Sequence, residues 1–314
     1  MLNRRQFIKA SAFASLGAVT LTSGLGLSNP VRAAKGDRVL IVGGGESGLA
    51  LAQGLSTSAV GLNVTVLDRH PSAKLARLAD LGISVLRGDA EGLDAKAATV
   101  STWQGLTHSY DHLVVAPGVD FLTDGIDGLQ GATLNAMPAF WSDRSDEDRF
   151  KARVSALPVS GTVVITVPKR PHRFEVGPYQ RANDAARQLA ATNPGAKVIL
   201  IDANDSPLMA MAPAVERVQG EILSARGFDL KLETTAGAIQ GDLVNLIPAQ
   251  QAGRFAAENG LVDASGWCPT DPLGRAGKAE HVWVIGDAVK AETDAPALDR
   301  ARFQADRVRS ALAS

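Results

Sequence analysis

The sequence predicts an α/β fold made of two Rossmann-like, three-layer units, each built on a parallel sheet. Two observations lead to this prediction: short β-branched runs alternate with helical segments along most of the chain, and the first of those runs ends directly in a glycine-rich loop. Strands that alternate with helices imply a mostly parallel sheet with helices on both faces. A chain of 314 residues has room for one large α/β domain or two smaller ones.

The first 33 residues have the pattern of a signal peptide. Arg4 and Arg5 are followed by Phe7, a stretch of apolar and small residues fills 10–27, and 31–33 (Val-Arg-Ala) resembles a small-residue cleavage site. Paired arginines before such a stretch are typical of the twin-arginine export route. An uncleaved membrane anchor is the alternative, but Gly, Ser and Thr residues interrupt the apolar stretch and make it a poor bilayer span.

We therefore expect a periplasmic protein whose mature chain begins near Ala34 and contains no membrane span. Twin-arginine export usually carries proteins that are already folded, often around a cofactor, so the leader itself suggests a cofactor. The formal net charge is −1 and the basic residues are not clustered, so nucleic acid is not an expected partner.

Strand-like and helix-like segments follow one another after the leader. Strands are expected at 38–42, 64–67, 83–86, 113–116, 162–167, 198–201, 243–247 and 281–285. Helices are expected from the glycine loop through about Ser56, and over 72–81, about 179–191 and about 296–313. The polar stretch 142–147 is the expected linker. The first unit is then formed by 34–141 and 242–314, and the second unit by 148–241.

The loop after the first strand is the strongest chemical signal in the sequence. Its spacing, Gly-x-Gly-x-x-Gly, is typical of dinucleotide binding: the first glycine permits a tight turn, the second lets a pyrophosphate approach the backbone, and the third lets the helix pack on the sheet. An acidic residue ends the expected second strand, where a carboxylate can bind ribose hydroxyls. A structural glycine turn is the alternative. The candidate residues are Gly43, Gly44, Gly45, Glu46, Ser47, Gly48 and Asp68.

Two later turns indicate which dinucleotide binds. One expected strand ends in Ala116, Pro117 and Gly118, and the last ends in Gly286 and Asp287. In flavoproteins with two dinucleotide-binding units, a turn like the first closes the FAD-binding unit, and an aspartate like the second holds the ribityl and pyrophosphate region. Each turn alone is equally well explained as an ordinary strand exit. Together with the glycine loop, and in this chain order, they favour FAD over NAD.

The second unit lacks a corresponding glycine loop. Its first strand is followed by 168–173, Pro-Lys-Arg-Pro-His-Arg, so binding of NAD(P)H there is not expected. Arg170, His172 and Arg173 could contact an anion or a partner, but a solvated basic loop is the simpler interpretation.

Several segments resemble the flavoprotein subunit of flavocytochrome c sulfide dehydrogenase. The resemblance spans nearly the whole mature chain, is most specific in the Trp-Cys-Pro and Asn-Leu-Ile-Pro runs, and rests on 110–121, 173–182, 242–254, 265–272 and 281–288. It implies FAD in the first unit, electron transfer to a cytochrome c, and the fold shared with sulfide:quinone oxidoreductases and disulfide reductases.

The chain also departs from that family. The resemblance implies two cysteines that form a redox-active disulfide beside the flavin. One would lie at 174–176, which is Phe-Glu-Val here, and the other in a C-terminal domain that this shortened chain lacks. A thiol–disulfide relay needs two sulfurs, whereas Cys268 is the only cysteine. We interpret Cys268 as a buried structural residue.

The expected function is that of an exported FAD-binding oxidoreductase or electron-transfer flavoprotein that lacks the disulfide-based sulfide chemistry of its relatives. Its expected partner is a cytochrome c or another periplasmic electron acceptor. The alternative is a non-catalytic accessory or interaction protein that retains the flavoprotein fold, with an NAD(P)-dependent reductase as a distant third. The five histidines show no metal-ligand spacing, so no metal site is expected, and no catalytic residue is assigned.

Overall fold

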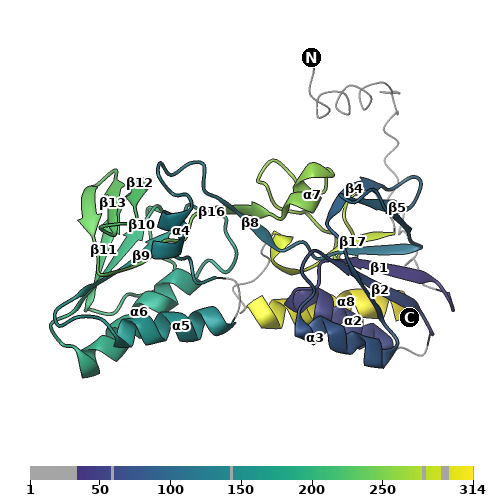
Figure 1. The fold of residues 1–314 in the computed structure, drawn as a ribbon, viewed down its shortest axis with the longest axis horizontal. Helices are drawn as coiled ribbons and strands as arrows, with labels where there is room; N and C mark the ends of the chain where they lie inside the picture. The colour runs from purple at the N-terminus through teal and green to yellow at the C-terminus, as the bar shows by residue number, and fades with distance from the viewer. Residues whose placement is uncertain (1–33, 58–59, 142–143, 278–280, 291–296, 314) are drawn as a thin grey trace, which may run out of the picture. The chain divides into compact units, whose positions relative to one another are not determined.

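In the computed structural model, the described part of the chain comprises residues 34–57, 60–141, 144–277, 281–290 and 297–313. The expected signal peptide lies outside these residues. Figure 1 shows two parallel sheets, each with helices packed against one of its faces, and the remaining described strands form smaller antiparallel sheets. Within this part of the chain, no helix is both long enough and apolar enough to cross a bilayer.

The first sheet has five parallel strands, and their order is typical of a Rossmann fold. In spatial order they are β17 (Val282–Val284), β7 (His112–Val115), β1 (Arg38–Val42), β2 (Asn63–Asp68) and β3 (Ser84–Arg87). The expected parallel sheet is therefore confirmed. The strand expected at 83–86 begins one residue later, which is within the usual uncertainty of strand ends.

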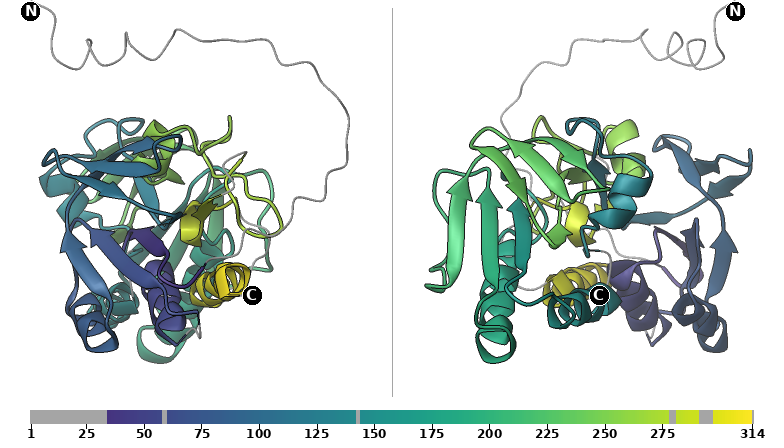
Figure 2. Two further views of the ribbon diagram at one scale, coloured as in Figure 1. Left: turned by 90° about the vertical axis from the view of Figure 1, so that its right-hand side faces the viewer. Right: turned by 60° about the vertical axis from the view of Figure 1, so that its left-hand side comes forward.

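Helices cover one face of this sheet. They are α2 (Glu46–Ser56), the short α3 (Ala73–Ala76) and α8 (Ala297–Ala313). Both views of Figure 2 show α8 (yellow) beside α2 (purple), so the two ends of the described chain meet here. Ile41, Leu51 and Val308 belong to one buried cluster between helices and sheet. The helix expected over 72–81 is wrong as a single element, because its second half tightens into a 3₁₀ turn, η1 (Arg77–Leu81).

The other face is covered by an antiparallel meander, which corrects the expectation of helices on both faces. The meander strands are β4 (Ala90–Asp94), β5 (Thr99–Thr102) and β6 (Thr107–Ser109). Val100, Tyr110 and Leu113 pack in a second buried cluster between meander and sheet, together with Phe255 of α7 (Arg254–Glu258). Turn residues separate these strands too closely for a helix, and Gly105 has a φ of +80°.

The second sheet repeats this arrangement. Its parallel strands are β11 (Val215–Gln219), β10 (Lys197–Asp202), β9 (Thr162–Val167) and β15 (Leu243–Asn245). Helices α5 (Arg144–Ser155) and α6 (Gly177–Thr192) cover one face. A meander of β12 (Ile222–Arg226), β13 (Lys231–Thr234) and β14 (Gly237–Gln240) covers the other.

Two boundary expectations are corrected here. The expected linker 142–147 overlaps the start of α5, because its acidic residues Asp146 and Glu147 lie in the first helical turn, where negative charge is stabilised; 142–143 lie outside the described residues. Strand β15 pairs with β9, so the second sheet continues past the expected division at 242. The unit boundaries otherwise stay a prediction.

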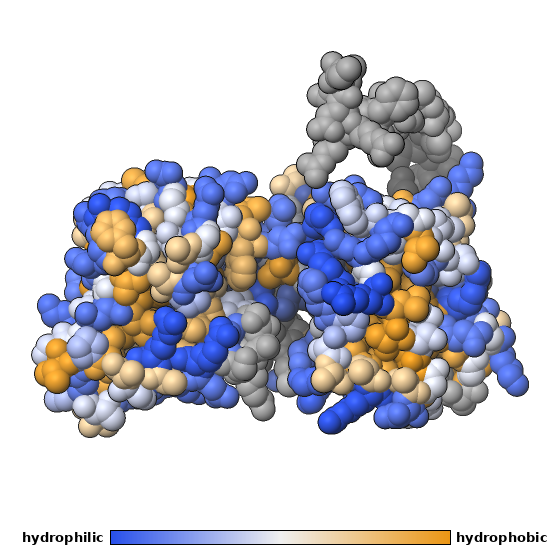
Figure 3. Space-filling model, viewed as in Figure 1, coloured by the Kyte–Doolittle hydropathy of each residue, from blue (hydrophilic) through white to orange (hydrophobic). Residues whose placement is uncertain are grey.

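An antiparallel ribbon is formed by two further strands: β8 (Val119–Leu122), which follows β7, pairs with β16 (Ala249–Ala252), which follows β15. The remaining short elements are α4 (Ala132–Ala136) and the 3₁₀ turn η2 (Gly286–Ala288). On the face drawn in Figure 3, hydrophilic residues surround smaller hydrophobic areas. Exposed apolar side chains of the described surface include Trp103, Val159 and Phe228.

Candidate functional site

Gly43 turns the chain sharply as it leaves β1. Its φ is +102°, and a Cβ atom at this position would lie 2.1 Å from the carbonyl oxygen of Ala116. The Gly43 amide donates a hydrogen bond of 2.9 Å to the carbonyl oxygen of Leu67, which ties the loop to β2. Only glycine therefore fits at the first loop position, because a side chain would collide with backbone atoms of the neighbouring strand.

Gly48 lets α2 approach that turn. A Cβ atom on Gly48 would lie 2.0 Å from the carbonyl oxygen of Gly43, and the residue is buried. Gly44 is similarly close to a side chain, because its Cβ would lie 2.1 Å from Leu75 Cδ1. These contacts agree with the packing role expected for the last glycine of the loop.

Gly45 differs from its neighbours. It is the N-cap of α2, has an ordinary φ of −66°, and has no atom within 4 Å of where its Cβ would lie. No side chain caps the amides of the first turn of α2 in the described structure. Free helix amides beside open space are a suitable cradle for an anion such as a pyrophosphate. Glu46, the next residue, is exposed and forms an ion pair with Lys74 at 3.0 Å.

Asp68 closes the loop from the end of β2. One carboxylate oxygen accepts the Gly44 amide at 2.7 Å, and the other accepts the His70 amide at 2.7 Å. A carboxylate has about four acceptor positions, so two amide bonds leave capacity for ribose hydroxyls. Asp68 and Gly43 both line a cavity of about 270 Å³.

That cavity has polar walls that the sequence did not reveal. Arg254, from the start of α7, donates to Asp89 Oδ2 at 2.9 Å, and Arg69 donates to the other oxygen of Asp89 at 3.1 Å. The Arg254 amide is bonded to Asp120 at 2.7 Å. Asp89, Asp120 and Arg254 are far apart in sequence, so only the fold brings them together at this cavity.

The turn at the end of β7 forms another wall. The Ala116 amide donates to the carbonyl oxygen of Val42 at 2.7 Å, and Pro117 lines the same cavity. Gly118 has a φ of +66° and its carbonyl oxygen accepts the Gly253 amide at 2.9 Å. The turn therefore lies between the glycine loop and the start of α7.

The Gly286–Asp287 turn meets the glycine loop from the far end of the chain. A Cβ atom on Gly286 would lie 2.7 Å from Ser47 Oγ, and the Gly286 amide donates to Gln304 Oε1 at 2.6 Å. The carboxylate of Asp287 lies 3.3 Å from Arg173 Nε, and both side chains are largely buried. The structure thus places the sequence-predicted residues along one edge of the first sheet, at the carboxyl ends of β1, β2, β7 and β17, and adds Arg173 to them.

In the second unit, the loop 168–173 is not a solvated basic loop. The His172 side chain is 2% exposed, and burial lowers the pKa of its imidazole to about 4. Arg170 donates to Asn204 Oδ1 at 3.1 Å, and Arg173 pairs with Asp287. The simpler interpretation of this segment is therefore wrong, because the loop folds back onto the protein.

In the second unit, the acidic residue at the end of a parallel strand forms hydrogen bonds within the protein. Asp202, at the end of β10, is 0% exposed. Its carboxylate accepts hydrogen bonds from Tyr179 at 3.0 Å, from Arg217 at 2.9 Å and from Asn204 at 2.9 Å. This acid has the position that binds a ribose in a nucleotide-binding unit. Here the side chain is enclosed, which agrees with the lack of a glycine loop.

Cys268 lies in the core beneath β17 and is 0% exposed. Burial raises the pKa of its thiol to about 12, so the reactive thiolate is suppressed. This environment fits the structural interpretation of the residue. Among the described residues, no group of His, Cys, Asp or Glu side chains is arranged to hold a metal ion.

Comparison with known proteins points to one flavoprotein family. Residues 148–248 match the model of the central part of the sulfide dehydrogenase [flavocytochrome c] flavoprotein chain. This segment holds the second sheet, α6 and most of α5, and it includes the Gly177 to Ala182 run that contributed to the resemblance.

Solved structures share the fold over most of the chain at low sequence identity. The sulfide:quinone oxidoreductase of Aquifex aeolicus aligns with a TM-score of 0.65 and 16% identity, over 87% of this chain and 76% of that one. The water-forming NADH oxidase of Lactobacillus brevis aligns with a TM-score of 0.65 and 16% identity, over 87% of this chain and 69% of that one. The CoADR-RHD protein of Bacillus anthracis aligns with a TM-score of 0.62 and 16% identity, over 88% of this chain. The aligned part spans only 57% of that protein. The chain therefore shares the fold of these oxidoreductases, and its residues 148–248 match the central part of the sulfide dehydrogenase flavoprotein chain.

Proposed function

We propose that this chain binds FAD along the carboxyl edge of its first sheet. The observation that carries the proposal is the open N-terminus of α2 at Gly45, where a Cβ would meet no atom although every other glycine of the loop is tightly packed. An uncapped helix end of this kind holds a pyrophosphate. The family model, which describes a flavoprotein chain, supports FAD as the dinucleotide.

We assign a different part of FAD to each of the residues around this helix end. The α2 amides at Gly45 hold the pyrophosphate, and Asp68 holds the adenosine ribose at the cavity of about 270 Å³. Asp287 faces the ribityl side, and Arg173 neutralises its carboxylate, which reduces repulsion between that carboxylate and the phosphates. The bound flavin supplies the electron-transfer chemistry, and the protein supplies binding, orientation and electrostatics.

The proposed activity is that of an oxidoreductase or electron-transfer flavoprotein that works without an internal disulfide. The chain has one cysteine, and its thiol is buried with a raised pKa. A disulfide relay within one chain needs a second sulfur, so electrons would reach and leave the flavin directly. A cytochrome c or similar electron carrier is the proposed acceptor.

Export by the twin-arginine route is part of the proposal. It rests on the sequence around Arg4 and Arg5. Expression of the full chain in a bacterium with this pathway should yield processed protein in the periplasmic fraction. The Arg4→Lys/Arg5→Lys variant should remain as unprocessed precursor in the cytoplasm; equal export of both forms would contradict this route.

One observation favours the second candidate, a non-catalytic accessory protein. Asp287, the expected second FAD anchor, already has Arg173 as an ion-pair partner at 3.3 Å. An ion pair that closes this end of the site would stabilise the fold in the absence of a cofactor. The two candidates differ in a single measurable property, the binding of FAD.

The deciding experiment is a titration of the purified chain with FAD, followed by visible absorption and flavin fluorescence. The key variant is Gly45→Ala, since the residue has an ordinary φ and open space around its Cβ position. Gly125→Ala is the matched control, because Gly125 also has open space and an ordinary φ but lies away from the loop. We expect stoichiometric binding that Gly45→Ala weakens at least about tenfold and Gly125→Ala leaves unchanged. A wild-type chain that takes up no FAD would contradict the flavoprotein proposal and favour the accessory protein.

A further inference from the structure

Asp37 lies one residue before β1, at the amino end of the first sheet. Its carboxylate oxygen Oδ2 accepts a hydrogen bond from the Ala34 amide at 2.7 Å. The Asp37 amide donates in turn to the carbonyl oxygen of Ala34 at 3.1 Å. Two hydrogen bonds therefore hold these residues together across a turn in which Gly36 has a φ of +90°.

This turn is attached to the segment that leads into β2. The Gly36 amide donates to the carbonyl oxygen of Gly61 at 3.0 Å, and the Gly36 carbonyl oxygen accepts the Asn63 side-chain amide at 2.7 Å. The Asn63 main-chain amide donates to the carbonyl oxygen of Asp37 at 2.9 Å. Backbone contacts therefore fix the position of the Ala34 nitrogen beside the carboxylate, and a contact arranged in advance loses little entropy when it strengthens.

The same carboxylate oxygen contacts a buried histidine. His112 Nε2 lies 3.1 Å from Asp37 Oδ2, and His112 is 2% exposed. A carboxylate only accepts hydrogen bonds, so Nε2 carries the hydrogen. Burial lowers the pKa of His112 below its usual 6.5, so the ring is neutral at pH 7 and brings no positive charge to Asp37.

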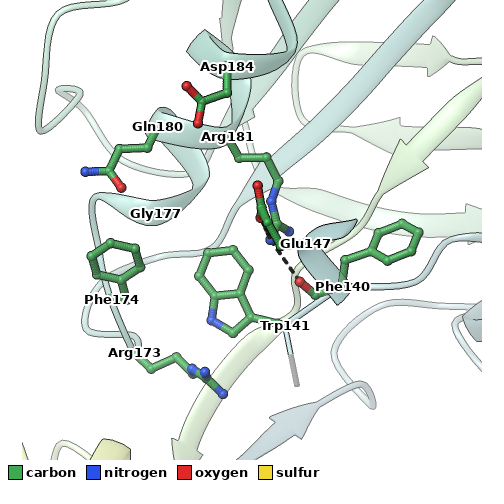
Figure 4. A pocket seen from close by; sticks show the side chains of 9 residues that line it. All are labelled: Phe140, Trp141, Glu147, Arg173, Phe174, Gly177, Gln180, Arg181 and Asp184. Carbon is green, nitrogen blue, oxygen red and sulfur yellow. Dashed lines mark hydrogen bonds and ion pairs between the residues drawn. The ribbon is translucent and has the colours of Figure 1, made fainter. Parts of the chain in front are cut away.

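Asp37 therefore has a negative charge without a cationic partner. Within the described part of the chain, no lysine or arginine forms an ion pair with it, and its side chain is only 28% exposed to water. Two other carboxylates show the usual arrangement. Asp111 pairs with Arg38 at 2.7 Å, and Glu147 pairs with Arg181 at 3.0 Å in the cavity drawn in Figure 4.

Removal of the expected leader would create a cation at this position. Cleavage after residue 33 makes Ala34 the first residue of the mature chain. Water hydrolyses the peptide bond: its hydroxyl adds to the carbonyl carbon of residue 33, its hydrogen passes to the Ala34 nitrogen, and that nitrogen takes a further proton from the solvent. The nitrogen beside Asp37 Oδ2 thus changes from a neutral amide with one hydrogen into an ammonium with three.

We propose that Asp37 is the acceptor for the amino terminus of the mature chain, so that removal of the leader stabilises the first sheet through an ion pair between Ala34 and Asp37. Opposite charges at this separation stabilise each other's charged forms. The inference rests on the proposed export and cleavage, and it goes beyond FAD binding, which it does not involve.

Few other charged or titratable groups surround the pair. Lys35 belongs to the same turn, and Arg38 at the start of β1 is paired with Asp111. His112 comes from β7, and the ring of His281, just before β17, lies 5.6 Å from the His112 ring. These groups are the same in every comparison made below, so their contributions cancel.

The test compares the chain that begins at Ala34 with the same chain acetylated at that amine, because acetylation restores an uncharged amide. Every residue of the four buried clusters lies at Val39 or later, so the chain from Ala34 contains the whole described core and can fold on its own. Asp37→Asn removes the charge and keeps an oxygen that accepts hydrogen bonds. Asp124→Asn is the matched control, since Asp124 is an exposed acid in the turn after β8.

Urea unfolding should show the ion pair directly. At pH 6 the unfolding equilibrium constant of the free-amine chain should be about two- to fivefold lower than that of the acetylated chain, the range of an exposed ion pair. The carboxylate raises the pKa of the ammonium, so the difference is fully present below the usual α-amino value of about 7.7–8.0 and is lost as the pH rises through the raised value. Salt at 1 M should reduce it. Asp37→Asn should abolish the difference, and Asp124→Asn should retain it.

NMR titration of the Ala34 α-amino group gives a second readout. The pH at which half of the amine is deprotonated should be about 0.5–1 higher in the wild type than in Asp37→Asn. Equal stability of the free and acetylated wild-type chains, or equal titration of the amine in wild type and Asp37→Asn, would overturn the proposal. Should Asp37→Asn fail to fold, the pH and salt dependence of the free and acetylated wild-type chains decides alone.

The export proposal is tested separately. The chains compared above are prepared with a defined first residue, so a failure of export leaves their result unaffected. N-terminal sequencing of protein from the periplasmic fraction should give Ala34 as the first residue. A mature chain that begins at another residue would overturn the role of Asp37 in processing.

Discussion

Ser47 and Gly286 lie in direct contact, although one is in the first turn of the first described helix and the other follows the last described strand. A Cβ atom on Gly286 would come to 2.7 Å from Ser47 Oγ and 3.2 Å from Ser47 Cβ. Gly286 also has a φ of +85°. The contact joins the glycine loop to the Gly286–Asp287 turn, so the two expected halves of the FAD site form one surface.

Substitution of Gly286 measures how firmly this contact constrains the fold. Gly286→Ala should lower the free energy of unfolding by about 2–3 kcal/mol, because positive φ and crowding both oppose a side chain. Gly105→Ala is the matched control, since Gly105 has a φ of +80° but open space around it, and it should lose only about 1 kcal/mol. Adding Ser47→Ala to Gly286→Ala should recover part of the difference in chemical denaturation. Equal losses at the two glycines would show that the contact imposes no constraint.

Gly48 provides a more stringent test of the loop than Gly286, because the atom nearest to a Cβ on Gly48 belongs to the backbone. A Cβ atom on Gly48 would lie 2.0 Å from the Gly43 carbonyl oxygen, and neither group can rotate away. Gly48→Ala should therefore destabilise the fold by about 3 kcal/mol or more. Gly45→Ala should leave the melting temperature of the cofactor-free chain unchanged. A Gly48→Ala chain as stable as wild type would mean that α2 can shift away from the turn.

The parts of the fold that could be predicted from sequence are those in which local pattern and burial coincide. The parallel strands are buried on both faces, so they appear as continuous β-branched runs, as at Arg38–Val42 and Thr162–Val167. The meanders were missed because their strands are short and half exposed, as at Ala90–Asp94, and such segments are typical of loops. Helix α5 was missed because its start is strongly polar and was interpreted as a linker.

The candidate site divides in the same way. The glycine loop and Asp68 could be predicted because the turn, the helix start and the strand end lie within one βαβ unit. The approach of Arg173 to Asp287, and of Arg254 to Asp89, depends on the packing of segments far apart in sequence. No local spacing carries that information, so these pairings became visible only in the folded chain.

Cys268 should be chemically silent in the native protein. It is fully buried, and burial raises the pKa of its thiol to about 12. Ellman's reagent should therefore not react with the native chain and should titrate one thiol after denaturation, since the thiolate is the reactive form. Cys268→Ser should bind FAD as tightly as wild type. If flavin is bound and sulfide reduces it in the wild type but not in Cys268→Ser, thiol chemistry would remain in this chain.

His172 should make stability depend on pH. The pKa of its buried imidazole is lowered from 6.5 to about 4, because burial disfavours the charged ring. The stabilising contribution of the neutral ring is present above about pH 6.5 and is lost as the pH falls toward about 4, over which the free energy of unfolding should drop by about 3 kcal/mol. His172→Gln should reduce this slope in urea unfolding of the FAD-free chain, whereas His70→Gln, at an exposed site, should retain it. Parallel curves for wild type and His172→Gln would contradict the assignment.

The hydrogen bond from Tyr179 to Asp202 should be needed for stability rather than for nucleotide binding. Both side chains are fully buried, and the Asp202 carboxylate also accepts from Arg217 and Asn204. Tyr179→Phe should cost about 1–2 kcal/mol, because it removes a donor to a buried charge. Asp202→Asn should cost about 3–5 kcal/mol, since it leaves the Arg217 guanidinium without its carboxylate.

Tyr110 provides the control for that loss. It is also buried, at 2% exposed, but its hydroxyl has no partner among the described residues. Tyr110→Phe should therefore leave the free energy of unfolding unchanged or raise it slightly, because no hydrogen bond is lost.

Neither the wild-type chain nor Asp202→Asn should bind NADH in calorimetry, because the Asp202 carboxylate is enclosed and the loop before α6 lacks the glycine spacing. NADH binding that Asp202→Asn abolishes would contradict this and would make the second unit a nucleotide site.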